Sequence, residues 1–160
     1  MFKFTTTMNL TASIRWGLMS LFLVFSLALS AQVSVDGKTC VGTWKTIDDE
    51  TGKARSYVKI YQENGKYYGK ITKLLNRTAD EDKDPVCAVC PGDRKNKKVV
   101  GMTIIDGMEK ESKRYAGGQI LDPKKGKLYS CTIWLENANT LKVRGWWGMF
   151  YRTQTWQRVD

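Results

Sequence analysis

Short runs of alternating hydrophobic and polar residues follow one another from residue 42 to the C-terminus. Alternation with a period of two is typical of strands with one buried face, and these runs are rich in β-branched and aromatic residues. Turn-forming pairs such as Asn64-Gly65 and Asp122-Pro123 separate the runs. The pattern predicts an all-β barrel or sandwich of about eight strands. The expected strands are residues 42–47, 55–62, 66–75, 99–105, 114–121, 127–136, 140–147 and 153–159, with a short helix possible near 106–111.

The dipeptide Asn64-Gly65 predicts a two-residue hairpin turn. This turn sets the register of its two flanking strands, in which Ile60 faces Gly69 and Val58 faces Ile71. These four residues form an apolar face, whereas tyrosines and lysines occupy the other face. We expect the apolar face to point into the protein, since register follows the buried pattern.

A second hairpin has one loop length that separates apolar from polar positions. A three-residue loop at 137–139 brings apolar or small residues together on one face, and a two-residue loop would mix charged and apolar residues on both faces. The longer loop therefore predicts an inward-facing Cys131. The predicted pairs are Leu135 with Leu141, Ile133 with Val143, Cys131 with Gly145, and Tyr129 with Trp147.

Residues 1–31 have the layout of a secretory signal peptide. Lys3 and Arg15 are their only charges, an apolar stretch follows, and small residues surround the end of the segment. The stretch is shorter than the roughly 20 residues that span a bilayer, so we expect cleavage after Ser30 or Ala31 and no retained transmembrane anchor. The sequence predicts a single domain at 32–160, exported to the periplasm or the extracellular space.

Composition narrows the chemistry that this chain can perform. The formal net charge is +10, or +8 after loss of Lys3 and Arg15, which favours attraction to an acidic ligand or to anionic envelope components. Export argues against nucleic acid as a partner. The sequence has no histidine, which excludes Ser-His-Asp and Cys-His catalysis and removes the commonest metal ligand. We therefore expect no enzymatic activity, no cofactor and no metal.

Cys87-x-x-Cys90 lies in the one long irregular segment, residues 76–98, and allows three interpretations. A redox dithiol normally opens a helix among alternating strands and helices. A zinc site needs four ligands, and the chain has no second Cys-x-x-Cys. Export favours the third interpretation, a disulfide that fastens the segment. Four cysteines allow three connectivities, and we favour Cys87–Cys90 because this pairing needs no assumption about the tertiary structure. Cys40 and Cys131 then remain, and nothing in the sequence places them side by side.

Gly42-x-Trp44 in the first expected strand resembles the first-strand signature of lipocalins and related calycin barrels. In that superfamily the tryptophan packs across the closed end of the barrel, and an arginine near the last strand stacks on it. Arg152 and Arg158 are the candidates here.

A wider series of segments resembles the bacterial exported family catalogued as domain of unknown function 2147, over about residues 41–159. The resemblance implies a lipocalin-like antiparallel β-barrel of about eight strands, and it implies no established reaction. The segments, in order, are GTWKTIDDETGKARS, YGKITKLLN, CAVCPGDRKNK, VVGM, AGGQILDPKKGKLYSC, LKVRGWWG and RTQTW.

Three functional hypotheses follow from these observations. The first is a non-enzymatic binder of a small amphiphilic or anionic ligand, with Tyr129, Trp147 and Arg144 as the ligand-binding residues. The second is an interaction or structural module of the cell envelope with a packed barrel. The third is a thiol-redox protein that uses Cys87 and Cys90. A cavity above roughly 300 Å³ would favour the first hypothesis. A filled barrel with a large exposed apolar or basic patch would favour the second, and a depressed thiol pKa at an exposed Cys87 would favour the third.

Overall fold

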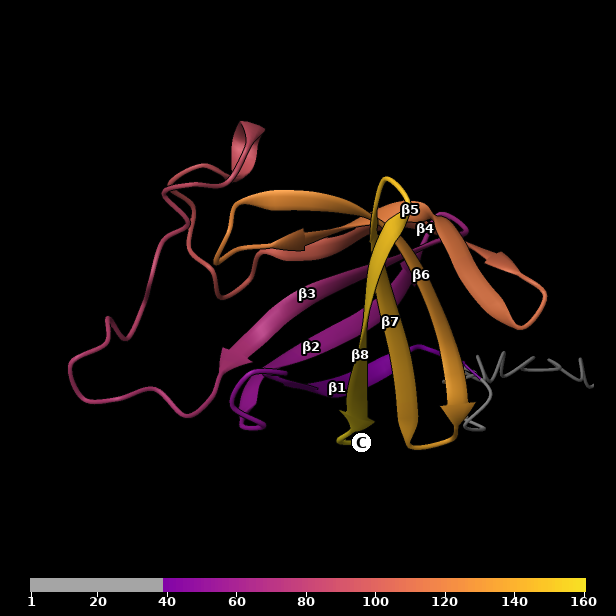
Figure 1. Ribbon diagram of the computed structural model, residues 1–160, viewed down its shortest axis with the longest axis horizontal. Helices are drawn as coiled ribbons and strands as arrows, with labels where there is room; N and C mark the ends of the chain where they lie inside the picture. The colour runs from indigo at the N-terminus through magenta and orange to yellow at the C-terminus, as the bar shows by residue number, and fades with distance from the viewer. Residues whose placement is uncertain (1–38) are drawn as a thin grey trace, which may run out of the picture. The chain divides into compact units, whose positions relative to one another are not determined.

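The computed structural model describes residues 39–160, which form eight antiparallel strands that close into a barrel (Figure 1). Each strand pairs with the next, and the pairing of Trp44 with Arg158 joins the last strand to the first. The predicted signal peptide, residues 1–31, lies outside the described residues. The strands are β1 (Gly42–Ile47), β2 (Ala54–Glu63), β3 (Lys66–Leu74), β4 (Thr103–Glu111), β5 (Arg114–Asp122), β6 (Lys127–Asn137), β7 (Thr140–Trp147) and β8 (Phe150–Arg158), with the short 3-10 helix η1 (Gly92–Arg94) between β3 and β4.

Alternating side chains of the strands fill the closed half of the barrel. In β2, for example, Val58 and Ile60 are fully buried while Lys59 between them is exposed. Every strand contributes in this way, which confirms the predicted all-β barrel with one apolar interior. The largest fully buried side chains are Trp44, Val58, Ile60, Ile105, Met108, Leu121, Ile133, Leu141, Val143 and Trp156.

The first predicted hairpin register is confirmed, with Ile60 opposite Gly69 and Val58 opposite Ile71. Gly69 lies against Ile105, and a Cβ there would lie 3.0 Å from the Cδ1 atom of Ile105, so that side chain would have to shift. The missing side chain lets β4 approach β3 closely.

The second hairpin has the predicted pairs Leu135–Leu141, Ile133–Val143 and Cys131–Gly145. A bulge before Asn137 adds the pair Asn137–Thr140, so the turn itself is the two residues 138–139. The β6–β7 pairing ends one step before the predicted pair of Tyr129 with Trp147. Tyr129 instead pairs with Ile120 of β5, and Trp147 with Phe150 of β8.

Two predicted boundaries are wrong. β4 spans Thr103–Glu111, where the sequence suggested a strand at 99–105 and a helix near 106–111. Gly107, at a φ of 70°, interrupts the alternation of this strand, and pairing with β5 overrides the helical preference of its last residues. β8 begins at Phe150 and not at Thr153, because its first residues extend the hairpin with β7.

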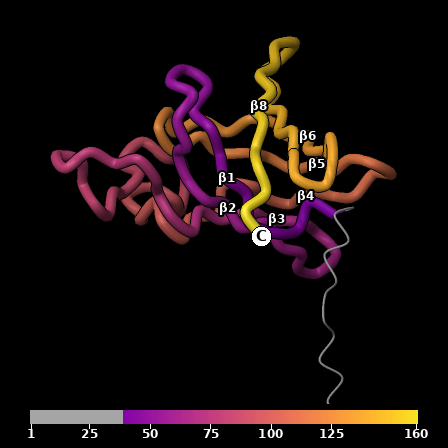
Figure 2. The backbone as a smooth tube through the Cα atoms, turned by 90° about the horizontal axis from the view of Figure 1, so that it is seen from below, coloured from indigo at the N-terminus to yellow at the C-terminus, as the bar shows by residue number. Residues whose placement is uncertain are grey.

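The two ends of the barrel differ in how their strands are connected (Figures 1 and 2). One end carries tight turns after β2, β4 and β6 together with the start of β1 and the end of β8. The other end carries the turns after β1, β5 and β7 and the long β3–β4 segment, residues 75–102. In the part of the chain that the structure describes, no helix is long and apolar enough to cross a membrane.

Candidate ligand-binding site

A cavity of about 770 Å³ occupies the half of the barrel next to the long β3–β4 segment. It lies within the roughly 300–1,000 Å³ that small-molecule sites usually have. Its wall is apolar at depth and is drawn from six strands. The deep apolar lining consists of Ile71, Ile104, Ile120, Leu121, Tyr129, Val143 and Trp156.

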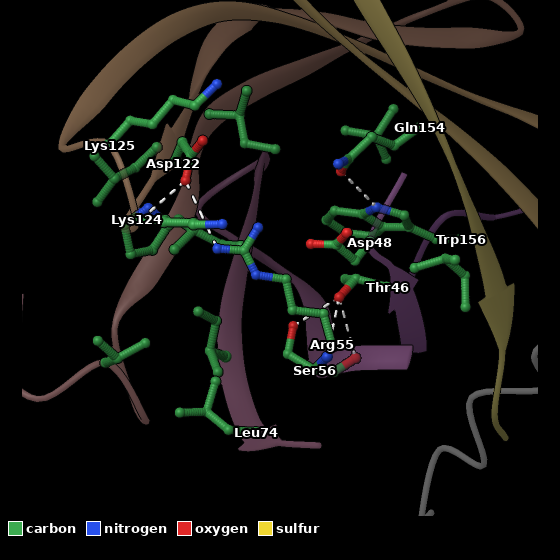
Figure 3. A pocket seen from close by; sticks show the side chains of 18 of the residues that line it. Thr46, Asp48, Arg55, Ser56, Leu74, Asp122, Lys124, Lys125, Gln154 and Trp156 are labelled. Atoms are coloured by element: carbon green, nitrogen blue, oxygen red, sulfur yellow. Dashed lines mark hydrogen bonds and ion pairs between the residues drawn. The ribbon is translucent and has the colours of Figure 1, made fainter. Parts of the chain in front are cut away.

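The polar groups at the bottom of this cavity bond to one another (Figure 3). The hydroxyls of Thr46 and Ser56 lie 2.8 Å apart, and the Ser56 backbone N–H donates to Thr46 Oγ1 at 3.1 Å. The indole N–H of Trp156 donates to Gln154 Oε1 at 3.2 Å. Among the described residues no buried side-chain nitrogen or oxygen lacks a partner. The depth of the cavity therefore suits an apolar chain better than a polar group.

The mouth of the cavity is charged and carries more cations than acids. Arg55 of β2 lies 3.9 Å from Asp122 at the end of β5, so this ion pair reaches between strands that are not neighbours (Figure 3). Within residues 39–160, Lys53, Lys124 and Lys125 enter no ion pair. The charged lining residues are Lys53, Arg55, Arg77, Lys124, Lys125 and Arg152, with Asp48, Glu81 and Asp122.

Asp48 shapes the β1–β2 turn at this mouth. Its carboxylate accepts the backbone N–H groups of Thr51 and Glu50 at 2.9 and 3.0 Å. The hydrogen bond from the Thr51 N–H is the largest cause of a lowered Asp48 pKa. This carboxylate is thus held by its own turn and stays charged.

The structure places two of the three predicted ligand-binding residues at the cavity. Tyr129 and Trp147 line it, Tyr129 at depth and Trp147 at the mouth. Arg144 is not among the lining residues, because its position in β7 points to the outer face. There its guanidinium lies 4.2 Å from the ring centre of Tyr151 and 5.0 Å from that of Trp134.

The barrel-base residues meet at the opposite end. Trp44 is fully buried, its indole N–H donates to the Cys40 carbonyl at 2.7 Å, and the Arg158 guanidinium lies 4.2 Å from its ring centre. Gly42 has a φ of 139°, and a Cβ there would collide with the Arg158 guanidinium. Of the two candidate arginines, Arg158 therefore stacks on Trp44. Arg152 lies at the cavity mouth, where it donates to Asp49 at 2.7 Å.

Cys87 and Cys90 form the predicted disulfide. Both are about 2% exposed, and the Cys87 sulfur lies 3.2 Å from the Pro123 carbonyl oxygen in the β5–β6 turn. The disulfide thus links two residues within the β3–β4 segment and lies against the turn that carries Lys124 and Lys125. Within the described residues no cluster of His, Cys, Asp and Glu could hold a metal.

Cys40 and Cys131 are free thiols buried in the barrel. Burial raises the pKa of each thiol to about 12. Neither has the low pKa that a reactive cysteine requires.

The cationic mouth is the part of the site that sequence reasoning missed. Arg55, Lys124 and Lys125 lie at strand ends or turns that are distant in sequence. A signal was available, since the ends of an up-and-down barrel alternate and the turns after β1 and β5 must share one end.

The family described as "Uncharacterized protein conserved in bacteria (DUF2147)" matches residues 42–158. The chain belongs to this family. No curated protein matched it.

One solved structure shares the fold of this DUF2147 member. It is described as "Protein HP1028 from the human pathogen Helicobacter pylori belongs to the lipocalin family" and has a TM-score of 0.64. The two chains are 22% identical, over 76% of this chain and 84% of the other. The likeness shows a lipocalin-like fold, which agrees with the closed eight-stranded barrel.

Proposed function

We propose that this protein is a non-enzymatic, exported binder of a small amphiphilic anion. The observation that carries the proposal is the cavity, which combines an apolar depth with a cationic mouth. An eight-stranded barrel of this kind either fills its interior with side chains or holds one ligand. About 770 Å³ of free space supports the second possibility.

The expected ligand has an apolar chain that matches the depth of the cavity and an anionic head group that matches its mouth. Its apolar chain would lie against Ile71, Ile104 and Val143, where burial of apolar surface contributes roughly 25 cal/mol per Å². Its anionic head would remain at the mouth near Lys124 and Lys125. These lysines are exposed and unpaired among the described residues, so binding an anion there breaks no existing ion pair.

Arg55 is the residue that we expect to respond to the head group. Its 3.9 Å contact with Asp122 is long for an ion pair, and the Arg55 side chain is 39% exposed. Such a pair contributes little to stability. An anion could therefore replace Asp122 at the guanidinium at small cost.

The test compares ligands that share one chain and differ in the head group. Dodecanoate, dodecyl sulfate, dodecanol and dodecyltrimethylammonium are titrated below their micelle concentrations, with heat or tryptophan fluorescence as the readout. We expect the two anions to bind at least tenfold more tightly than the cation, with the alcohol between them. Equal binding of all four would reject the anionic head, and no binding of any would reject the cavity as a site for alkyl chains.

Export is tested separately by the intact mass of the protein recovered from the cell envelope. We expect the mature chain to begin at Ala31 or Gln32. Exported protein that retains residues 1–30 would contradict the signal-peptide prediction.

A further inference from the structure

The turn between β7 and β8 exposes four large apolar side chains in a run of five residues. Trp147 is 71% exposed, Met149 84%, Phe150 67% and Tyr151 58%, with Gly148 between the first two. The turn projects beyond the body of the barrel, on the same side as the β1–β2 turn (Figure 2). Elsewhere in residues 39–160 the large apolar residues that are similarly exposed are valines and one leucine, scattered along the chain.

This exposure is not needed for the fold. Trp147 pairs with Phe150 through the backbone, so polar residues could close the same hairpin. A soluble protein gains stability by burying such side chains, and exposed apolar patches of this kind mark interaction sites. We call the segment Trp147–Tyr151 the aromatic tip.

The outer face of the barrel next to the aromatic tip also carries aromatic side chains and an arginine. Tyr151 lies 4.9 Å from Trp146, centre to centre, and both rings face the guanidinium of Arg144. Arg144 Nε also donates to Thr153 Oγ1 at 2.8 Å, which fixes its position. Tryptophan, tyrosine and arginine on one surface are the residues that favour the headgroup level of a bilayer.

Lysines of the β5–β6 turn region lie near the aromatic tip. Lys127 Nζ lies 5.7 Å from the Trp147 ring centre, and Lys124 and Lys125 precede it in the same turn region. In the neighbouring β1–β2 turn Asp49 pairs with Arg152 and Asp48 accepts hydrogen bonds from its own turn, while the exposed Glu50 enters no ion pair among the described residues. The three lysines also enter no ion pair within residues 39–160, so they are available to an external anion.

We propose that the aromatic tip docks onto the surface of an anionic lipid bilayer. Met149 and Phe150 enter the acyl boundary, while Trp147 and Tyr151 stay at the headgroups. Lys124, Lys125 and Lys127 contact lipid phosphates. Charge complementarity selects this partner, because each cation near an anionic bilayer strengthens binding and apolar residues alone would not discriminate between lipids.

Docking in this orientation would place the cavity mouth against the bilayer. Trp147, Phe150 and Tyr151 belong both to the aromatic tip and to the cavity lining. A membrane amphiphile could then move from the headgroup layer into the barrel without crossing water. This step rests on the proposed function, whereas the docking itself does not.

The docking is tested by co-sedimentation with sucrose-loaded vesicles. Vesicles of phosphatidylglycerol with phosphatidylethanolamine are compared with vesicles of phosphatidylcholine alone. We expect the protein to sediment with the first and not with the second, and to be released by high salt. Absence of binding to the anionic vesicles would overturn the proposal.

Matched variants locate the contact. Phe150→Asp should weaken binding about tenfold or more, whereas Val159→Asp, the same charge change at an exposed valine near the closed end, should leave it within about twofold. Lys124→Glu/Lys125→Glu should weaken binding about tenfold, against little effect of Lys110→Glu/Lys113→Glu at the far β4–β5 turn. Equal effects of test and control would overturn the proposal.

Docking and ligand binding can be told apart. Binding to vesicles without binding of any soluble dodecyl ligand would support the docking and reject the proposed cavity function. Binding of the dodecyl ligands without binding to vesicles would support the cavity function and reject the docking. Sedimentation velocity completes the test. A dimer that Phe150→Asp dissociates, without vesicle binding, would show that the aromatic tip pairs with a second copy and would overturn the proposal.

Discussion

Arg158 closes the base of the barrel by covering Trp44 with its guanidinium, 4.2 Å from the ring centre. The same guanidinium donates to the carbonyls of Val41, Thr39 and Ala138 at 2.7–3.0 Å. One side chain thus joins the start of β1, the β6–β7 turn and the end of β8. A lysine lacks the planar group that stacks on the ring, and its donors sit on one nitrogen, so it could not make these contacts together.

Replacing Trp44 should destabilise the protein strongly. Trp44→Ala removes a fully buried ring and the cation–π contact, so we expect a loss of about 3–5 kcal/mol in the free energy of unfolding. Trp147→Ala is the control, because Trp147 is 71% exposed and its loss should cost about 0.5 kcal/mol or less. Urea denaturation measures both. Similar midpoints for the two variants would contradict the role of Trp44.

The Cys87–Cys90 disulfide should act locally. It closes a loop of only a few residues, so its removal should cost about 2 kcal/mol or less. Cys87→Ser/Cys90→Ser should fold, and limited proteolysis should cut it within residues 76–98 faster than the native protein. Unchanged cleavage would show that backbone bonds such as Cys87 N–H to Lys97 O are sufficient.

The oxidation state of this pair needs its own measurement, since burial alone could prevent labelling. Protein unfolded in denaturant without reductant should therefore label at Cys40 and Cys131 only. Reductant should add Cys87 and Cys90. Labelling of all four without reductant would show that the exported protein lacks the disulfide.

Much of this fold is encoded locally, which is why the sequence predicts it. Asn64-Gly65 permits one tight turn, and alternation on either side then determines which residues face inward. β4 shows where local rules fail. Gly107, at a positive φ, interrupts the alternation just before the buried Met108, and neither residue alone reveals that β4 pairs with β5.

The candidate site was less predictable than the fold. Tyr129 was predicted to face inward because its strand has a clear inward face, and it lines the cavity. The mouth depends on Arg55 meeting Asp122 from a strand that is not its neighbour, which no local pattern encodes. The volume of the cavity depends on the sum of all inward side chains. The sequence therefore did not reveal whether the barrel is hollow or filled, which separates the ligand-binding hypothesis from the packed-barrel hypothesis.

Partly filling the cavity should weaken ligand binding without unfolding the barrel. Gly145 lines the cavity, and a Cβ there would be in ordinary contact, 3.4 Å from the Tyr129 Cβ. Gly145→Leu should fill part of the free volume and weaken dodecanoate binding at least tenfold. Ser130→Leu adds similar bulk on the outer face of β6 and should leave binding unchanged. Equal affinities would place the ligand outside the barrel.

Arg55 should contribute to the affinity for ligands with an anionic head group. Arg55→Gln removes a cation at the mouth and should weaken dodecanoate binding about three- to tenfold, with little effect on dodecanol. Asp122→Asn should strengthen dodecanoate binding, because Arg55 then has no competing carboxylate, while the amide oxygen can still accept the Lys124 N–H. Isothermal calorimetry measures the affinity of each variant for dodecanoate and for dodecanol. Equal changes for the two ligands would argue against a charged contact at Arg55.

The two buried thiols should make the protein less stable at alkaline pH. Burial raises the pKa of Cys40 and Cys131 from 9.0 to about 12, so between these values the unfolded chain releases protons that the folded chain retains. The contribution of the two protonated thiols to the free energy of unfolding is complete below about pH 9. It is lost as the pH rises toward 12, at up to about 1.4 kcal/mol per pH unit for each thiol.

The control for this effect is Cys40→Ala/Cys131→Ala. Tyr67 and Tyr115 also have raised pKa values, chiefly because of burial, and this part destabilises native and variant proteins alike in the same pH range; the smaller part that comes from the neighbouring Cys40 counts with the thiols. The difference between the two proteins therefore reports the thiols. We expect urea midpoints measured between about pH 8 and pH 11 to fall more steeply for the native protein. Parallel curves would mean that these thiols ionise in the folded barrel as readily as in the unfolded chain.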